Sequence, residues 1–264
     1  MVMDPALSAT RVKLKIRKMA GSLGAEVRGL DVAGGLDPQT VKALREAFLQ
    51  HQVIVLRDQT LSPAQQVQFA RYFGEPIVHP LYPSLPGHPE LLEIKNAGKK
   101  RSLTEIWHTD TSSLERPPAI TMLHAKVIPE AGGDTMFANQ YDAYEGLSSG
   151  LKTLVAGLRA VHTSASETNM HPVVRTHHET GRRALFVNAY FVRTFENMTE
   201  AESRPLLGFL FSVAASPEYT YRHAWSVGDL LMWDNRCVQH YAIHDYGDAR
   251  REMHRAMIEG DRPV

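Results

Sequence analysis

The sequence predicts a mainly β domain with a few helices packed on the outside of a sheet. Strand-like runs of β-branched and other apolar residues dominate the middle and end of the chain, whereas helix signals are few. No repeat, low-complexity stretch or linker separates these patterns, so we expect one domain over residues 1–264. The strand-like runs cover Val53 to Arg57, Ala119 to Val127, Ala184 to Asn188, Asp229 to Trp233, and Arg251 to Glu259.

The first quarter of the chain predicts an edge strand and two capped helices. Residues 1–20 alternate apolar and basic side chains without a continuous apolar core, which is typical of an edge strand and not of a signal peptide. Asp37, followed by proline, can cap a helix that runs to about Gln50. Ser62, also followed by proline and with Gln65 three positions later, predicts a second helix of similar design.

Two further helices and one hairpin are expected in the second half. Residues 141–158 predict a helix that Gly146 and Gly150 interrupt, and Thr199 with Glu202 forms a capping box before an apolar run. Residues 179–182 read Glu-Thr-Gly-Arg between two strand-like runs, which indicates a hairpin turn.

Residues 76–105 contain four prolines and show no clear periodicity. We expect an irregular connection there, and loops of this length often act as lids or binding loops.

Composition excludes several classes of protein. Twenty-nine basic residues balance 29 acidic ones, so no overall field attracts nucleic acid or an anionic membrane. The single cysteine, Cys237, excludes an internal disulfide and a cysteine-based zinc site, which suits a reducing cytoplasm. No segment approaches the roughly 20 apolar residues of a membrane span. We therefore expect a cytoplasmic protein that binds neither nucleic acid nor membrane.

A metal site is predicted by His108 and Asp110, which are followed much later by His240. On a strand, residues two apart project from the same face, so the first two side chains can reach one ion. Two histidines and one carboxylate form the facial triad that binds Fe(II) and leaves positions open for a co-substrate and oxygen. The pattern predicts an iron-dependent oxygenase, although in a chain with 13 histidines one such pair also arises by chance.

Further segments carry a resemblance to a known family. They are Arg57 to Gln59, His79 to Pro83, Gly132 to Thr135, Phe186 to Asn188, Trp233 to Arg236, Gln239 to Ala242, and Arg251 to Arg255. In order and spacing they resemble the taurine dioxygenase family of Fe(II)/2-oxoglutarate-dependent oxygenases over nearly the whole chain. The resemblance implies a double-stranded β-helix (jelly-roll) core with flanking helices, and iron ligands His108, Asp110 and His240.

A 2-oxoglutarate site is expected beside the iron. The distal carboxylate of that co-substrate needs a buried partner, and the planar fork of arginine pairs with carboxylates bidentately. Arg251 and Arg255 share one face of a predicted strand. The resemblance assigns Arg251 and the Thr135 hydroxyl to the distal carboxylate, and Arg255 to the iron-side carboxylate and the anionic end of the substrate. A solvated cationic edge is the alternative explanation for the two arginines.

The substrate is expected to carry one anionic group. By resemblance, His79 binds that anion together with Arg255, whereas a plain turn residue is the alternative. Tyr82 and Phe191 match positions of the substrate pocket and suit an apolar body, although core packing explains them nearly as well.

The pair Leu103 and Thr104 departs from the taurine pattern, in which an Asp-Asn pair recognises the amine. A buried ammonium without its carboxylate is costly, so this difference argues against taurine itself. We expect an alkyl- or arylsulfonate, a sulfate ester or a phenoxyalkanoate. Hydroxylation coupled to conversion of 2-oxoglutarate and O₂ to succinate and CO₂ would then release an aldehyde or ketone and the leaving anion.

Other functions stay open. Within the family, the alternatives are taurine dioxygenase proper and a biosynthetic hydroxylase or desaturase of a larger metabolite. A zinc hydrolase with the same ligands would not need Arg251 and Thr135, and a non-catalytic jelly roll would normally lack one member of the triad. The family also contains dimers and tetramers, so a homo-oligomer is possible.

The remaining histidines and the cysteine are not expected to bind metal. His177 and His178 lie beside the hairpin turn and should be exposed, and Cys237 should be a small buried filler. Trp233 and Asn235 are expected to support His240. The histidines without partners at ligand spacing are His162, His171, His223 and His244.

Overall fold

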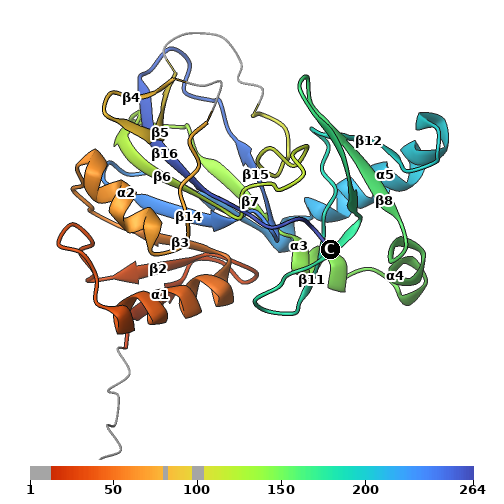
Figure 1. Cartoon of the computed structure of the whole chain (residues 1–264), viewed down its shortest axis with the longest axis horizontal. Helices are drawn as coiled ribbons and strands as arrows, with labels where there is room; N and C mark the ends of the chain where they lie inside the picture. The colour runs from red at the N-terminus through yellow and green to blue at the C-terminus, as the bar shows by residue number, and fades with distance from the viewer. Residues whose placement is uncertain (1–12, 80–82, 97–103) are drawn as a thin grey trace, which may run out of the picture.

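The computed structural model describes residues 13–79, 83–96 and 104–264, and an eight-stranded sheet forms its centre (Figure 1). The strand order is β1-β2-β3-β14-β6-β16-β5-β4, with β2 and β3 parallel and the other neighbours antiparallel. The strands are β1 (Lys15–Lys18), β2 (Ala25–Arg28), β3 (Val53–Leu56), β14 (Leu230–Asp234), β6 (Ile120–Val127), β16 (Arg251–Ile258), β5 (His88–Asn96) and β4 (Ser84–Leu85).

Three smaller sheets complete the β structure. Their orders are β13-β7-β15, β12-β8-β9 and β10-β11. The strands are β13 (Thr220–His223), β7 (Thr135–Asn139), β15 (Val238–Ala242), β12 (Val192–Phe195), β8 (Arg159–Thr163), β9 (Thr168–Pro172), β10 (Val174–Thr176) and β11 (Arg183–Leu185).

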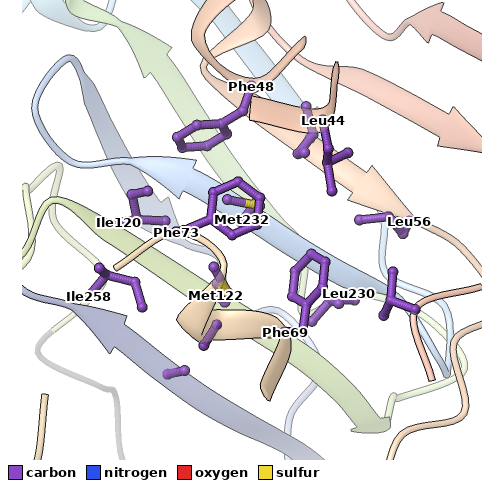
Figure 2. Packing of buried hydrophobic residues seen from close by; sticks show 14 of the residues in the cluster. Leu44, Phe48, Leu56, Phe69, Phe73, Ile120, Met122, Leu230, Met232 and Ile258 are labelled. Carbon is purple, nitrogen blue, oxygen red and sulfur yellow. The ribbon is translucent and has the colours of Figure 1, made fainter. Parts of the chain in front are cut away.

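Helices α1 (Pro38–His51) and α2 (Pro63–Arg71) cover the outer face of the large sheet. Figure 2 shows Phe48 and Phe69 of these helices facing Leu230 and Met232 of β14. Side chains alternate across a strand, so every second residue of β14 meets the helices. This layer is a helix-on-sheet core.

The opposite face of the large sheet packs against the sheet β13-β7-β15. Leu231 and Trp233 of β14 share a second core with Phe137 of β7 and Val238 of β15. Met253 of β16 belongs to the same core, and it lies between Arg251 and Arg255 at alternate positions of that strand. Both arginines therefore project toward the space between the two sheets.

A third core holds the remaining helices against the small strands, with Val155, Phe195 and Leu210 among its buried residues. These helices are α3 (Gln140–Glu145), α4 (Ser149–Val155), α5 (Glu200–Ala214) and the 3-10 helix η1 (Pro217–Tyr219). Among the helices of the described part of the chain, none is long and apolar enough to cross a bilayer.

Most predicted elements are confirmed where the structure describes them; residues 1–12 of the predicted edge strand lie outside the described residues, and β1 forms in its remainder. The Asp37 side chain caps α1, and complete capping boxes start α2 at Ser62 and α5 at Thr199. The strand predicted from Ala184 to Asn188 is wrong at its end, because β11 stops at Leu185.

Two predictions of secondary structure are wrong. The single helix over 141–158 is two helices, because Gly146 is the C-cap of α3 and Ser148 caps the separate α4, whereas Gly150 lies within α4 and does not interrupt it. The irregular connection over 76–105 contains β4 and the nine-residue strand β5, which pairs with β16 along the interior of the large sheet. Pro89 near the start of β5 argued against a strand at this position.

Truncation of Phe69 tests the helix-on-sheet core. This ring is 1% exposed and lies 5.5 Å from the Phe73 ring, so Phe69→Ala leaves a large cavity. We expect the free energy of unfolding to fall by about 3–5 kcal/mol in denaturant titrations. Phe209→Ala removes a ring that is 45% exposed and should cost less than about 0.5 kcal/mol. Equal losses in the two variants would contradict the packing described.

Candidate metal centre

Two histidines from distant parts of the chain meet in a short backbone bridge. The amide of His108 donates to the carbonyl of His240 at 3.0 Å, and the amide of His240 donates back at 2.8 Å. Asp110 follows at the beginning of a turn, in which Thr111 has the left-handed φ of 38°. His108 and Asp110 thus lie on an isolated bridge and the turn after it, and not within the regular strand that the sequence predicts.

The three predicted metal ligands lie together and are buried. Asp110 Oδ1 is 3.9 Å from His108 Nε2 and 3.7 Å from His240 Nε2, and all three donors lie within 4.8 Å of one another. Two donors that bind one ion at about 2.1 Å lie at most about 4.2 Å apart. Both carboxylate–imidazole distances meet this limit, so the donor set fits a single divalent ion.

The protonation states suit metal binding. His108 Nδ1 lies 2.7 Å from the Ile106 carbonyl oxygen, which only accepts, so Nδ1 holds the proton and Nε2 is free to bind an ion. Burial lowers the pKa of His108 and of His240. Burial alone would raise the pKa of Asp110, but the charge of Arg255 and the hydrogen bond from Thr121 hold it below its usual value. Neutral imidazoles and an ionised carboxylate result.

Hydrogen bonds and ring contacts surround the ligands. Asp110 Oδ2 accepts a hydrogen bond from Thr121 Oγ1 at 2.6 Å, and Arg255 Nη2 lies 2.7 Å from Asp110 Oδ1. The Trp233 ring packs against the His240 ring at a centroid distance of 4.7 Å. Asn235, expected beside His240, bonds instead to Thr121 and Trp233.

A cavity of about 110 Å³ connects the triad to Arg251. Arg251 is 8% exposed, its Nε donates to the Gly133 carbonyl at 3.1 Å, and burial lowers the pKa of its guanidinium. Among the described residues no carboxylate forms an ion pair with it. Thr135 also lines this cavity, and its hydroxyl accepts a hydrogen bond from Trp225 Nε1 at 3.0 Å. The structure thus brings Thr135 and Arg251 to one side of the metal ligands.

A second, larger cavity of about 430 Å³ is lined by His108 and Asp110 of the triad. His79 and Phe191, both predicted for the substrate, line it, and burial together with Arg255 lowers the pKa of His79. Tyr82 and Leu103 lie outside the described residues. The two cavities share Ile94, Thr104, Asp110 and Arg255.

Several lining residues were not found in the sequence. Tyr190 has its ring 5.9 Å from that of His108, and Met257 lines the larger cavity from β16. Tyr246 lines the smaller cavity. Thr121, which bonds to Asp110, was also missed, although it is a hydroxyl residue between apolar residues at the start of β6.

The prediction for His177 is wrong. Its side chain is 1% exposed and Nε2 lies 3.0 Å from Asp234 Oδ2, whereas His178 is half-exposed as expected. Arg236 binds both oxygens of Asp234 at 2.7 and 2.8 Å, so this cluster is a buried ion-pair network. Cys237 beside it is buried, and burial raises the pKa of its thiol, which fits an inert filler.

Two more histidines have acidic neighbours that the sequence did not indicate. His223 Nε2 lies 3.1 Å from Asp229 Oδ2, and His244 Nδ1 lies 3.6 Å from Glu105 Oε1. Neither pair has a third metal-ligating group among the described residues.

Comparison with known proteins agrees with this arrangement. The profile described as "Taurine catabolism dioxygenase TauD, TfdA family" matches residues 15–257. Identity is 36% with an alpha-ketoglutarate-dependent sulfate ester dioxygenase of Pseudomonas putida, over 96% of this chain and 92% of the relative. It is also 36% with an alpha-ketoglutarate-dependent 2,4-dichlorophenoxyacetate dioxygenase of Cupriavidus pinatubonensis, over 91% and 96%. A crystal structure described as a taurine dioxygenase from Burkholderia xenovorans superposes with a TM-score of 0.89 at 38% identity, over 95% of this chain and 91% of the other.

Removal of the carboxylate tests the metal site. Asp110→Ala deletes the anionic donor between the two imidazoles, so we expect loss of divalent-metal binding in anaerobic calorimetry and loss of all iron-dependent turnover, with an intact fold by circular dichroism. Asp31→Ala, on an exposed loop, should bind metal like the parent protein. Full metal affinity after removal of the Asp110 carboxylate would rule out the ligand set.

Proposed function

The chain belongs to the taurine catabolism dioxygenase TauD, TfdA family, and from this premise we propose that it hydroxylates a small anionic substrate with an apolar tail. It is an Fe(II)- and 2-oxoglutarate-dependent dioxygenase, because its named relatives are alpha-ketoglutarate-dependent dioxygenases and His108, Asp110 and His240 can hold a metal ion. The substrate classes are alkyl- or arylsulfonates, sulfate esters and phenoxyalkanoates. Hydroxylation beside the heteroatom would release the leaving anion and an aldehyde or ketone.

The observation that carries this proposal is that residues of the triad line two cavities, one of which also holds Arg251 and Thr135 and the other His79. His108, Asp110 and His240 would hold Fe(II), which with 2-oxoglutarate and O₂ supplies the oxidising power for C–H hydroxylation. Arg251 and Thr135 bind the distal carboxylate of 2-oxoglutarate in the smaller cavity. A buried guanidinium without a carboxylate partner among the described residues favours a bound dicarboxylate there.

The larger cavity suits an anion with an apolar body. His79 and Arg255 supply hydrogen-bond donors and positive charge at the triad, whereas Phe191 and Met257 contribute apolar surface. The sulfate ester and phenoxyacetate of the two named relatives share this combination of an anionic group and a carbon body. Orientation of the anion would direct one C–H bond toward the metal.

An ammonium group would lack a partner in this cavity. Of the described residues that line it, only Asp110 and Glu93 are carboxylates. Arg255 contacts the first, and Lys95 pairs with the second at 2.7 Å. This arrangement, with the neutral Thr104 at the cavity, disfavours taurine. The 38% identity to the structure described as a taurine dioxygenase keeps taurine as the second candidate.

The fold supports a finer assignment. We propose that the large sheet and the sheet β13-β7-β15 are the two halves of a double-stranded β-helix, because they enclose one core and the triad lies between them. The three cores are continuous through shared strands, which supports a single domain over residues 1–264.

Substitution of Gly133 tests the role of Arg251. Gly133 has a φ of +75°, and a Cβ there would lie 3.2 Å from Arg251 Cδ and 3.1 Å from Tyr246 Cδ1. Gly133→Ala should displace the guanidinium and raise the KM for 2-oxoglutarate by roughly up to 100-fold. Gly181→Ala is a matched control, because Gly181 has a φ of +68° and, in the described part of the chain, its new methyl group would meet no neighbour within 4 Å. An equal KM in both variants would mean that Arg251 does not bind the co-substrate.

A substrate panel tests the function itself. The purified protein, loaded anaerobically with Fe(II) and 2-oxoglutarate, receives O₂ with an alkyl sulfate, an alkylsulfonate, a phenoxyacetate or taurine, and succinate is measured. We expect stimulation by at least one apolar-tailed anion and not by taurine. Strong stimulation by taurine alone would overturn the substrate proposal. If no compound stimulates turnover, a larger metabolite becomes the better candidate.

A further inference from the structure

We propose that Thr121 and Asn235 hold Asp110 so that only one of its carboxylate oxygens can bind the metal. Neither residue is a ligand, so both are positioning residues. The inference rests on the proposed function, because it concerns how the same triad keeps a position open for O₂.

The contacts form a series of hydrogen bonds that all run in one direction, from Asn235 through Thr121 to Asp110. Asn235 Nδ2 donates to Thr121 Oγ1 at 2.8 Å, and Thr121 Oγ1 lies 2.6 Å from Asp110 Oδ2. A threonine hydroxyl has one proton, and an amide NH₂ group can only donate. The hydroxyl therefore accepts a hydrogen bond from Asn235 and donates one to Asp110. Thr121 is fully buried, so no water competes for this proton.

The orientation of the Asn235 amide is itself fixed. Its Oδ1 accepts from the indole Nε1 of Trp233 at 3.0 Å and from the backbone amide of Asp110 at 3.4 Å. A flipped amide would place its NH₂ group against these two donors. The series of hydrogen bonds thus begins at the backbone amide of Asp110 and ends at the Asp110 side chain, so that it forms a closed ring.

The consequence concerns the number of open metal positions. Asp110 Oδ2 accepts the hydrogen bond of Thr121, whereas Oδ1, which also lies 2.7 Å from Arg255 Nη2, is the oxygen that faces the Nε2 atoms of both histidines. Carboxylates bind metals through one oxygen or through two. With one oxygen bound, a six-coordinate ion keeps three positions, which suffice for bidentate 2-oxoglutarate and O₂. A second bound oxygen would take the position that O₂ needs.

Thr121→Val removes the hydroxyl and preserves the shape of the side chain. We expect weaker Fe(II) binding, by roughly 10- to 100-fold, in anaerobic titrations. We also expect a diminished electron paramagnetic resonance signal when nitric oxide, a probe of the O₂ position, is added to the Fe(II)–2-oxoglutarate complex. Thr121→Ser restores the hydroxyl and should restore both properties.

Thr109→Val is the matched control. Thr109 lies between the two ligands, is 4% exposed, and its hydroxyl donates to the Val238 carbonyl at 3.5 Å. Loss of this buried hydroxyl should change neither metal binding nor the nitric oxide signal. If Thr121→Val does not fold, Asn235→Asp is the second test, because a carboxylate at that position can only accept and would compete with Asp110 for the hydrogen bond that Thr121 donates.

The outcomes separate the two hypotheses. If the parent protein binds neither Fe(II) nor 2-oxoglutarate, the proposed function and this inference both fail. If the parent protein binds both and a folded Thr121→Val or Asn235→Asp variant behaves identically, only the positioning role is wrong. Equal effects of Thr109→Val and Thr121→Val would also overturn it, because any buried hydroxyl would then serve.

Discussion

The reciprocal backbone hydrogen bonds between His108 and His240 are the constraint on which the site depends. They bring together two segments that are distant in the sequence and place the two imidazole centroids 4.1 Å apart. His240 lies on β15, whose partner β7 carries Thr135 opposite Ala242. The same small sheet therefore positions a metal ligand and a residue of the smaller cavity, so that neither location depends on a mobile loop.

The alternation of side chains along β16 gives that strand two roles. Ala256 and Ile258 face the helix layer, whereas Arg251, Met253 and Arg255 face the space between the sheets. Arginines that are withdrawn from water cost free energy unless partners compensate. The apolar burial of α1 and α2 on the outer face offsets such a cost, so the helices stabilise a strand that presents charge to the site.

The sequence was informative where chemistry is local. Helix caps such as Ser62 and Thr199, the apolar strands, and the three metal donors follow from patterns within a few residues or from a known ligand set. The sequence was misleading where contacts with residues distant in the chain determine the local structure. Pro89 concealed β5, which is specified by its pairing with β16, and His177 is buried by its contact with Asp234. The link from Asn235 through Thr121 to Asp110 joins three elements, so no spacing in the sequence reveals it.

Arg255 lines both cavities and contacts the carboxylate between them. A ligand in one cavity that moves this guanidinium also changes the free energy with which a ligand binds in the other cavity. By thermodynamic linkage, each ligand changes the binding free energy of the other by the same amount. Substitutions at Arg255 would therefore alter selectivity and co-substrate affinity together. His79, Phe191 and Met257 line only the larger cavity. Substitutions at these three positions can therefore change the substrate range without changing the lining of the 2-oxoglutarate cavity.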